Sequence, residues 1–252
     1  MKPLFFFFLA LLLTIYGCTG SGHGLSGNGT GGNASDPGRP DADVSVPGSS
    51  ASNTTSPPAS PSEVDIDALA SKGLSMGSND APVVMVEFSD YQCQFCRRFW
   101  ITNFDTLKED YIDTGKVRFV YRDFPLEFHN AAKDSAEAVA CAEEQGMGWE
   151  MHDKIFSVQA EKSTGLVFYA RSDLKQWAGE IGLVQEEFDE CFDSGRHAGE
   201  VEESVADGVG AGVNATPSFF IGTVKGSNVV PLSGALPYGT FRATIEELLE
   251  SQ

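Results

Sequence analysis

Two cysteines separated by two residues, Cys93 and Cys96, are the side chains of this sequence best suited to covalent chemistry. They follow an apolar run at 83–88 that is typical of a buried strand, and a helical pattern begins at the pair. A thiolate at a helix start is stabilised by unpaired backbone N–H groups and by the positive end of the helix dipole. We therefore predict that Cys93 is the exposed nucleophile with a lowered pKa, and that Cys96 resolves a mixed disulfide on Cys93.

Cysteines at this spacing are also typical of half a zinc site. A zinc site needs further ligands, and the sequence has no second Cys-x-x-Cys motif and no pair of histidines at ligand spacing. The sequence therefore favours redox chemistry by the cysteines themselves, with no metal and no cofactor.

The elements that position this pair are predicted from the spacing of apolar residues. Strands at 83–88 and 117–121 flank a helix from the cysteine pair to about Asp113, and this order joins parallel strands by a right-handed crossover. The same criteria predict a block of helices, then two strands and a final helix. The helices lie at 131–145, 149–159, 172–181, 185–193, 197–210 and 240–250, and the strands lie at 218–221 and 229–233. The region 63–252 is thus one α/β domain with a substantial core.

Four motifs in this region resemble those of the DsbA-like thiol–disulfide oxidoreductases of the thioredoxin superfamily. They are Glu-Phe-Ser-Asp-Tyr-Gln-Cys-x-x-Cys-Arg-Arg-Phe at 87–99, Phe-Pro-Leu-x-Phe-His at 124–129, Trp-Glu-Met-His-Asp at 149–153 and Gly-Val-Asn-Ala-Thr-Pro-Ser-Phe-Phe-Ile at 212–221. The resemblance extends from about Leu74 to the C-terminus. It implies a thioredoxin fold with a helical insertion at about 130–212, between a β-α-β half and a C-terminal β-β-α half. The pair Gln94-Phe95 departs from the Pro-His pair typical of the strong oxidant.

The resemblance also implies roles for residues outside the cysteine pair. In the resembled fold, the peptide bond between Thr216 and Pro217 is cis, faces the cysteines and leaves the preceding backbone free to pair with a substrate segment. Glu87 stands where the family keeps a buried acid that assists proton transfer to or from Cys96. The alternative for Glu87 is a strand-edge carboxylate in solvent. His129 is expected to cap or pack rather than to catalyse.

The cysteine count gives a test of this interpretation. The sequence has five cysteines, at positions 18, 93, 96, 141 and 191. If Cys18 is lipidated and the Cys93–Cys96 pair is redox-active, Cys141 and Cys191 remain for each other. Because an oxidising compartment favours pairing, we predict a disulfide between two helices of the insertion. The alternative is two buried free thiols.

Residues 1–18 have the pattern of a lipoprotein signal peptide. Lys2 precedes an apolar run at 4–15, which is short for a transmembrane helix, and Ile-Tyr-Gly-Cys at 15–18 resembles a lipoprotein cleavage site with Cys18 as the lipidated residue. The alternatives are an uncleaved anchor and ordinary secretion. All three readings locate the folded domain outside the cytoplasm, and in the lipoprotein reading the lipid on Cys18 attaches it to a membrane.

Residues 19–62 are predicted to be a disordered linker. Gly, Ser, Thr, Asn, Pro and Asp dominate this segment, and it has too few apolar residues to offset the entropy of ordering. Three glycosylation sequons, at Asn28, Asn33 and Asn53, lie in the linker, and a fourth lies at Asn214.

The net charge of −19 restricts the partners of the chain. Nucleic acid is excluded as a partner because phosphate binding needs a cationic surface. An acidic surface is typical of halophilic proteins and is also found among secreted ones. We expect an oxidase that introduces disulfides into reduced secreted proteins and is regenerated by a quinone-linked membrane partner of the DsbB or VKOR type. A reductase or isomerase of the same fold and a peptide-binding chaperone with structural cysteines are the alternatives.

Overall fold

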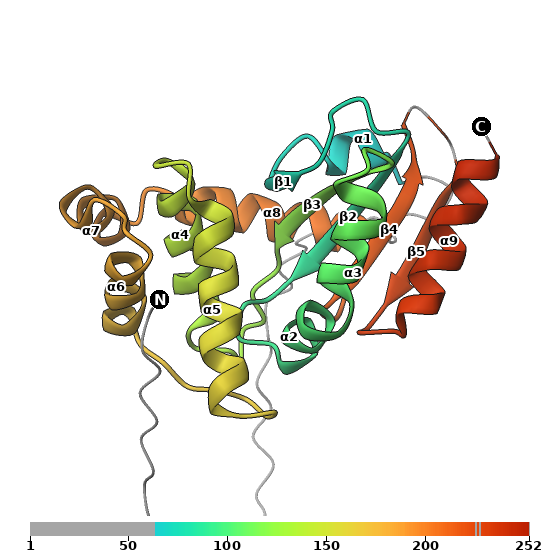
Figure 1. The fold of residues 1–252 in the computed structure, drawn as a ribbon. Helices are drawn as coiled ribbons and strands as arrows, with labels where there is room; N and C mark the ends of the chain where they lie inside the picture. Colours follow the sequence, from blue (N-terminus) through green and yellow to red (C-terminus); the bar gives the residue numbers. More distant parts are fainter. Residues whose placement is uncertain (1–63, 225, 227, 252) are drawn as a thin grey trace, which may run out of the picture. The chain divides into compact units, whose positions relative to one another are not determined.

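The structure is a computed structural model that describes residues 64–224, 226 and 228–251. The predicted signal peptide, the lipidation site at Cys18 and the linker at 19–62 lie outside the described residues. The folded part is one α/β unit in which helices cover both faces of a sheet (Figure 1).

The sheet has five strands in the order β1-β3-β2-β4-β5 (Figure 1). Strands β2 and β3 are parallel, as predicted from the crossover, and all other neighbouring pairs are antiparallel. The strands are β1 (Leu74–Met76), β2 (Val83–Ser89), β3 (Val117–Asp123), β4 (Ser218–Thr223) and β5 (Val229–Ser233). Every residue of β2 is buried, because this strand lies at the centre of the sheet between two layers of helices.

Alternation along β2 divides its side chains between two apolar clusters. Val83 and Met85 pack into the larger cluster, which contains both Cys93 and Cys96. The next residues along the strand, at 84, 86 and 88, pack into the smaller cluster on the opposite face. Because side chains two residues apart share a face, Glu87 projects toward the layer that holds the cysteines.

The helical layer on the cysteine side begins with α2 (Gln94–Phe99). It continues through a π-helical segment (Trp100–Phe104), α3 (Asp105–Leu107) and a second π-helical segment (Lys108–Ile112). These segments form the predicted helix that leads back to β3. The last helix, α9 (Tyr238–Glu250), packs beside it through Phe241, whose ring centroid lies 5.2 Å from that of Phe99.

Five helices form the predicted insertion between β3 and β4. They are α4 (Ala132–Glu143), α5 (Gly148–Lys162), α6 (Arg171–Glu180), α7 (Gln185–Ser194) and α8 (Ala198–Gly210). A disulfide joins Cys141 of α4 to Cys191 of α7, with 5.8 Å between the Cα atoms. The thioredoxin fold with a helical insertion is therefore confirmed.

Two short elements at the start of the folded part were not predicted. They are α1 (Ile66–Leu69), which lies on the sheet face opposite the cysteines, and β1, which adds an antiparallel edge to β3. Neither element is long enough to display a helical or an alternating pattern, so the sequence carried no periodic signal for them.

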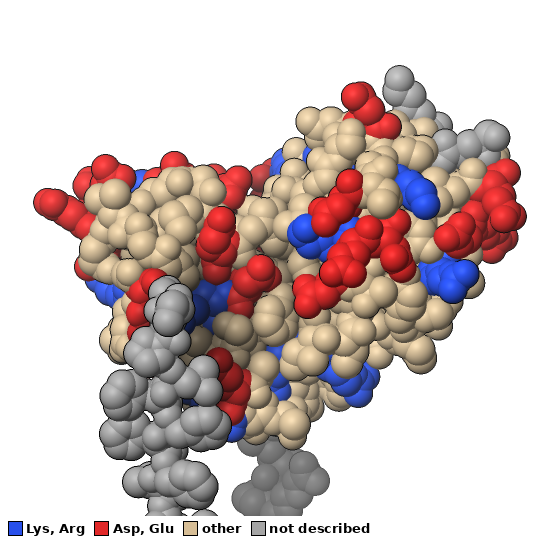
Figure 2. All heavy atoms as spheres, viewed as in Figure 1, with Lys and Arg blue, Asp and Glu red and all other residues tan. Residues whose placement is uncertain are grey.

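Acidic side chains are spread over the face drawn in Figure 2, with basic ones between them, in keeping with the net charge of −19. Within residues 64 to 251, the structure contains no helix with the length and apolar character needed to cross a membrane.

Candidate active site

The two cysteines lie at the start of α2, at the end of the sheet where β2 and β3 finish. Cys93 is the N-cap residue of α2 and Cys96 lies in its first turn, and both are free thiols. The structure therefore describes the reduced form of the pair.

The prediction that Cys93 is exposed is wrong, since only 4% of its surface is accessible. The segment before β4 covers it, and the Cys93 Sγ lies 3.5 Å from the carbonyl oxygen of Thr216. Thr216 and Pro217 are themselves buried, and the peptide bond between them is cis. This cover comes from a segment more than a hundred residues along the chain, which explains why local sequence could not reveal it.

Asp90 organises the loop that leads into the cysteine pair. Its buried carboxylate accepts hydrogen bonds from the backbone N–H groups of Gln92 at 2.7 Å and of Leu126 at 2.8 Å. The same carboxylate pairs with His129 Nδ1 at 2.8 Å, and the Asp90 carbonyl oxygen accepts from the Cys93 N–H at 3.0 Å. Asp90 therefore connects the cysteine loop to the motif that ends at His129.

His129 is held in place by this pair rather than by a helix cap. Its pKa is raised, first by the hydrogen bond to Asp90, and the charge of the nearby Cys93 acts in the same direction. Asp90 was not predicted to be a functional residue. The sequence signal that could have identified Asp90 is an acidic residue directly after the apolar run at 83–88 and just before the cysteine pair.

Gln92, immediately before Cys93, anchors two segments of the insertion. Its Nε2 donates to the carbonyl oxygen of Val167 at 2.9 Å, and its Oε1 accepts from the N–H of Ala131 at 2.9 Å. From α5, Gln159 Nε2 donates to the carbonyl oxygen of Tyr91 at 2.7 Å. The cysteine loop is thus fixed to the insertion by side-chain amides, which sequence reasoning also missed.

The environment lowers the pKa of Cys93 to about 6. The main cause is the hydrogen bond that the Cys96 thiol donates to the Cys93 thiolate, and burial opposes it. The backbone N–H groups of Phe95 and Cys96 add to the lowering, as expected at a helix start. The pKa of Cys96 is raised, mainly by burial and next by the neighbouring Cys93. At neutral pH Cys93 is therefore the thiolate and Cys96 the protonated thiol.

Glu87 is buried, with 3% of its surface accessible, so it is not a strand-edge carboxylate in solvent. Burial raises the pKa of Glu87 to about 8, and the charge of Cys93 acts in the same direction. Glu87 in turn contributes to the raised pKa of Cys96. A protonated carboxyl group beside the protonated cysteine can exchange a proton near neutral pH.

The two arginines after the cysteine pair differ in environment. Arg97 is buried at 2% accessibility and donates to the carbonyl oxygen of Gly165 at 2.7 Å. Arg98 is exposed, donates to the carbonyl oxygen of Ala235 at 3.3 Å and lies over the ring of Phe95. Of the two arginines, only Arg98 is exposed to solvent.

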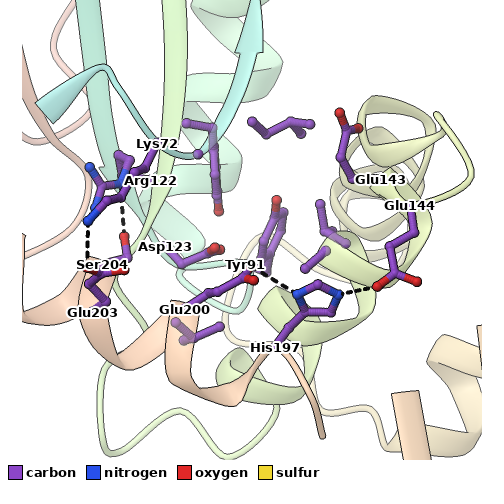
Figure 3. A pocket seen from close by; sticks show the side chains of 16 residues that line it. Lys72, Tyr91, Arg122, Asp123, Glu143, Glu144, His197, Glu200, Glu203 and Ser204 are labelled. Atoms are coloured by element: carbon purple, nitrogen blue, oxygen red, sulfur yellow. Dashed lines mark hydrogen bonds and ion pairs between the residues drawn. The ribbon is translucent and has the colours of Figure 1, made fainter. Parts of the chain in front are cut away.

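A cavity of about 520 Å³ lies behind the cysteine loop, between the sheet edge and the insertion (Figure 3). Its lining carries Tyr91 from the cysteine loop, Asp123 from the end of β3 and His197 before α8. His197 bridges Glu144 at 2.8 Å and Glu200 at 2.9 Å. Tyr91 and Tyr121, whose hydroxyl groups are buried, also line this cavity.

Within residues 64 to 251, one group of three side chains is close enough to share a metal ion: Cys141, Cys191 and His197. The disulfide consumes both sulfur atoms, so only the imidazole remains as a ligand. Three or more ligands are needed for a structural or catalytic zinc site, and this group does not fit one.

The geometry agrees with known proteins of one family. Residues 70–247 match the family model of thioredoxin (Thioredoxin_4). Among solved structures, alpha-DsbA1 of Wolbachia pipientis superposes with a TM-score of 0.61 at 24% identity, covering 70% of this chain and 90% of that one. BdbD of Bacillus subtilis in its oxidised form superposes with a TM-score of 0.59 at 26% identity, covering 70% of this chain and 92% of that one.

Among curated proteins, the chain is 32% identical over 143 residues to probable disulfide bond formation protein D of Bacillus anthracis, covering 52% of this chain and 59% of that one. It is 33% identical over 146 residues to Na(+)/H(+) antiporter NhaA 3 of Salinispora tropica, covering 58% of this chain and 21% of that one. The chain thus spans less than two thirds of the length of these relatives. With the matched family model, the chain belongs to the thioredoxin family, and its fold is shared with the solved DsbA and BdbD structures.

Proposed function

We propose that this protein is an extracytoplasmic oxidase that introduces disulfides into secreted proteins through the Cys93–Cys96 pair. The observation that supports this proposal most directly is the opposite displacement of the two cysteine pKa values. The pKa of Cys93 is lowered to about 6 and the pKa of Cys96 is raised. This difference distinguishes the sulfur that is attacked, on Cys93, from the sulfur that resolves the mixed disulfide, on Cys96.

In the proposed reaction, the oxidised protein carries a Cys93–Cys96 disulfide. A substrate thiolate attacks the Cys93 Sγ, the bond between the two protein sulfurs breaks, and Cys96 leaves and takes up a proton. A second substrate thiolate then attacks the mixed disulfide, and Cys93 leaves as a thiolate. Two electrons pass from the substrate dithiol to the protein disulfide, which is thereby reduced to the dithiol. A low pKa makes Cys93 the better leaving group in this second step.

Other residues of the site support these steps. Glu87, with a pKa of about 8, is positioned to supply the proton that Cys96 takes up. The backbone at Thr216, whose carbonyl oxygen lies 3.5 Å from the Cys93 Sγ, is proposed to pair with the substrate segment beside the reacting sulfur.

The direction of the reaction separates the proposal from its alternative, a reductase or isomerase of the same fold. Stabilising the Cys93 thiolate stabilises the reduced protein, and this makes the disulfide more oxidising. We expect equilibration with a glutathione buffer to give a reduction potential above that of thioredoxin, about −270 mV. A value at or below that of thioredoxin would reassign the protein as a reductant.

The proposed location is the outer side of a membrane, with Cys18 lipidated. A Cys18→Ser variant should move from the membrane fraction to the soluble fraction, because it lacks the lipid anchor. Unchanged fractionation would mean that the apolar segment itself is the anchor or that there is no anchor.

Catalytic turnover as an oxidase requires an acceptor for the two electrons. The proposed acceptor is a membrane oxidoreductase of the DsbB or VKOR type that passes the electrons to a quinone. It would reoxidise Cys93 and Cys96 by the same exchange chemistry, without nucleic acid, metal or a bound cofactor in this protein.

A further inference from the structure

A cavity of about 340 Å³ lies beside the first turns of the cysteine helix, and no acidic side chain lines it. One wall is formed by α2 and the π-helical segment that follows, including Arg97, Arg98 and Thr102. The other wall is formed by the end of α5 and the next loop, including Ser163 and Thr164. The lining therefore offers two guanidinium groups and several hydroxyl groups, in a chain with a net charge of −19.

Arg97 forms no salt bridge with a carboxylate among the described residues, and the negative charge that acts on it is that of the Cys93 thiolate in the reduced protein. Its guanidinium donates only to neutral oxygens, the Gly165 carbonyl at 2.7 Å and Gln159 Oε1 at 3.5 Å, and the second contact is long. Its side chain is almost completely buried. In the oxidised protein Cys93 is not a thiolate, so the buried guanidinium lacks this counter-charge and carries a desolvation cost that an anionic ligand offsets.

Arg98 contributes a second cation to the same cavity. It makes no ion pair in the described part of the chain, and its guanidinium lies over the ring of Phe95, 5.1 Å from the centroid. Phe95 and Ile101 are apolar, 44% and 54% exposed, and both line the cavity. The cavity thus has two guanidinium groups, from Arg97 and Arg98, next to the exposed apolar side chains of Phe95 and Ile101.

The cavity adjoins the reactive sulfur through the two residues between the cysteines, since Gln94 and Phe95 both line it. We propose that this cavity binds a carboxylate of the thiol substrate, carried on a residue close to the reacting cysteine. This inference rests on the proposed oxidase function and adds a preference for acidic substrates. An acidic residue of a protein substrate and the carboxylates of a small thiol such as glutathione share this chemistry.

Two cysteine peptides that differ only in Glu or Gln near the cysteine measure this preference. Each reduced peptide is mixed with the oxidised full-length protein, and the rate of loss of the Cys93–Cys96 disulfide is recorded. The Glu:Gln rate ratio is then compared between variants, so that the intrinsic reactivity of each peptide cancels. Glutathione and its dimethyl ester form a second pair, which separates a small thiol from a protein segment as the source of the carboxylate.

We expect the ratio to fall about fivefold in Arg98→Gln, in the range of charge-assisted contacts at a partly exposed site, and further in Arg97→Gln. Arg98→Lys should retain part of the preference, and added salt should weaken it. The matched control, Lys175→Gln, removes a positive charge on α6, where Lys175 pairs with Asp193 at 2.8 Å, and should leave the ratio unchanged.

Equal ratios in the native protein and Arg98→Gln, for both the peptide pair and the glutathione pair, would overturn the inference while the oxidase function stands. A loss of preference with only one pair supports the inference and identifies the source of the carboxylate. If Arg97→Gln fails to fold, Arg98→Gln still decides the question. If the native disulfide reacts with none of the four thiols, the proposed function itself is wrong.

Discussion

The reactivity of Cys93 should persist well below neutral pH. A thiol with a pKa of about 6 is about 90% ionised at pH 7, whereas an ordinary cysteine with a pKa of ~8.5 is about 3% ionised. The reduced protein should therefore carry about thirtyfold more thiolate at Cys93 than a free cysteine. Because the thiolate is the nucleophile, the alkylation rate should rise with pH up to about 6 and then level off.

The perturbation that tests the cause is Cys96→Ala. The hydrogen bond from the Cys96 thiol is the main cause of the lowered pKa, so its removal should move the midpoint of Cys93 toward the ordinary value. Cys96→Ser is the matched control, because its hydroxyl still donates a hydrogen bond and should retain part of the lowering. The backbone N–H groups remain in both variants and should keep each midpoint below that of a free cysteine.

The same pKa sets part of the reduction potential. At pH 7 the ionisation of Cys93 favours the reduced protein about tenfold over one with an ordinary thiol, which is ~1.4 kcal/mol or ~30 mV for a two-electron couple. Iodoacetamide alkylation and the ultraviolet absorbance of the thiolate, each followed against pH, measure the midpoint independently. A midpoint near ~8.5 in the reduced native protein would refute the reasoning.

Three further predictions follow from the cysteines and from Glu87. Cys96→Ala should trap mixed disulfides with secreted proteins and Cys93→Ala should not, because Cys93 carries the attacked sulfur. Equal trapping by both variants would refute this assignment of roles. Replacing both Cys141 and Cys191 with Ala should lower the free energy of unfolding by about 4 kcal/mol in urea titrations, since the bond closes a loop with a sequence separation of 50, while Cys93 alkylation stays unchanged. A fall in that alkylation rate would mean that the disulfide also supports the site. The folded protein holds the Glu87 proton up to about pH 8, whereas the unfolded chain releases it near 4.5, so stability falls as pH rises between these values. Glu87→Gln should remove this pH-dependent loss of stability and stabilise the reduced protein by about 3 kcal/mol at pH 7. The same variant should slow disulfide exchange. An unchanged urea midpoint would indicate that the Glu87 carboxylate is solvated.

Much of the fold could be predicted because its signals are local and periodic. The strand at 83–88, the helix from the cysteines and the five helices of the insertion all have apolar residues at the spacing of their element. The π-helical segments within the cysteine helix were not predicted, since a π turn shifts the register without interrupting the apolar pattern.

The residue types and spacing of Cys93 and Cys96 determined that this chain carries a dithiol at a helix start, and the order of strands and helices determined the fold around it. Tertiary structure alone decided how that dithiol is surrounded. Thr216 covers Cys93 from a segment distant in sequence. Arg97 is buried and donates to a backbone carbonyl oxygen instead of a carboxylate. The carboxylate of Asp90 accepts a hydrogen bond from the backbone N–H of Leu126. Burial and charge at a site depend on which residues distant in sequence are brought together. A local pattern can therefore specify the element and the chemistry, but not the environment that sets each pKa.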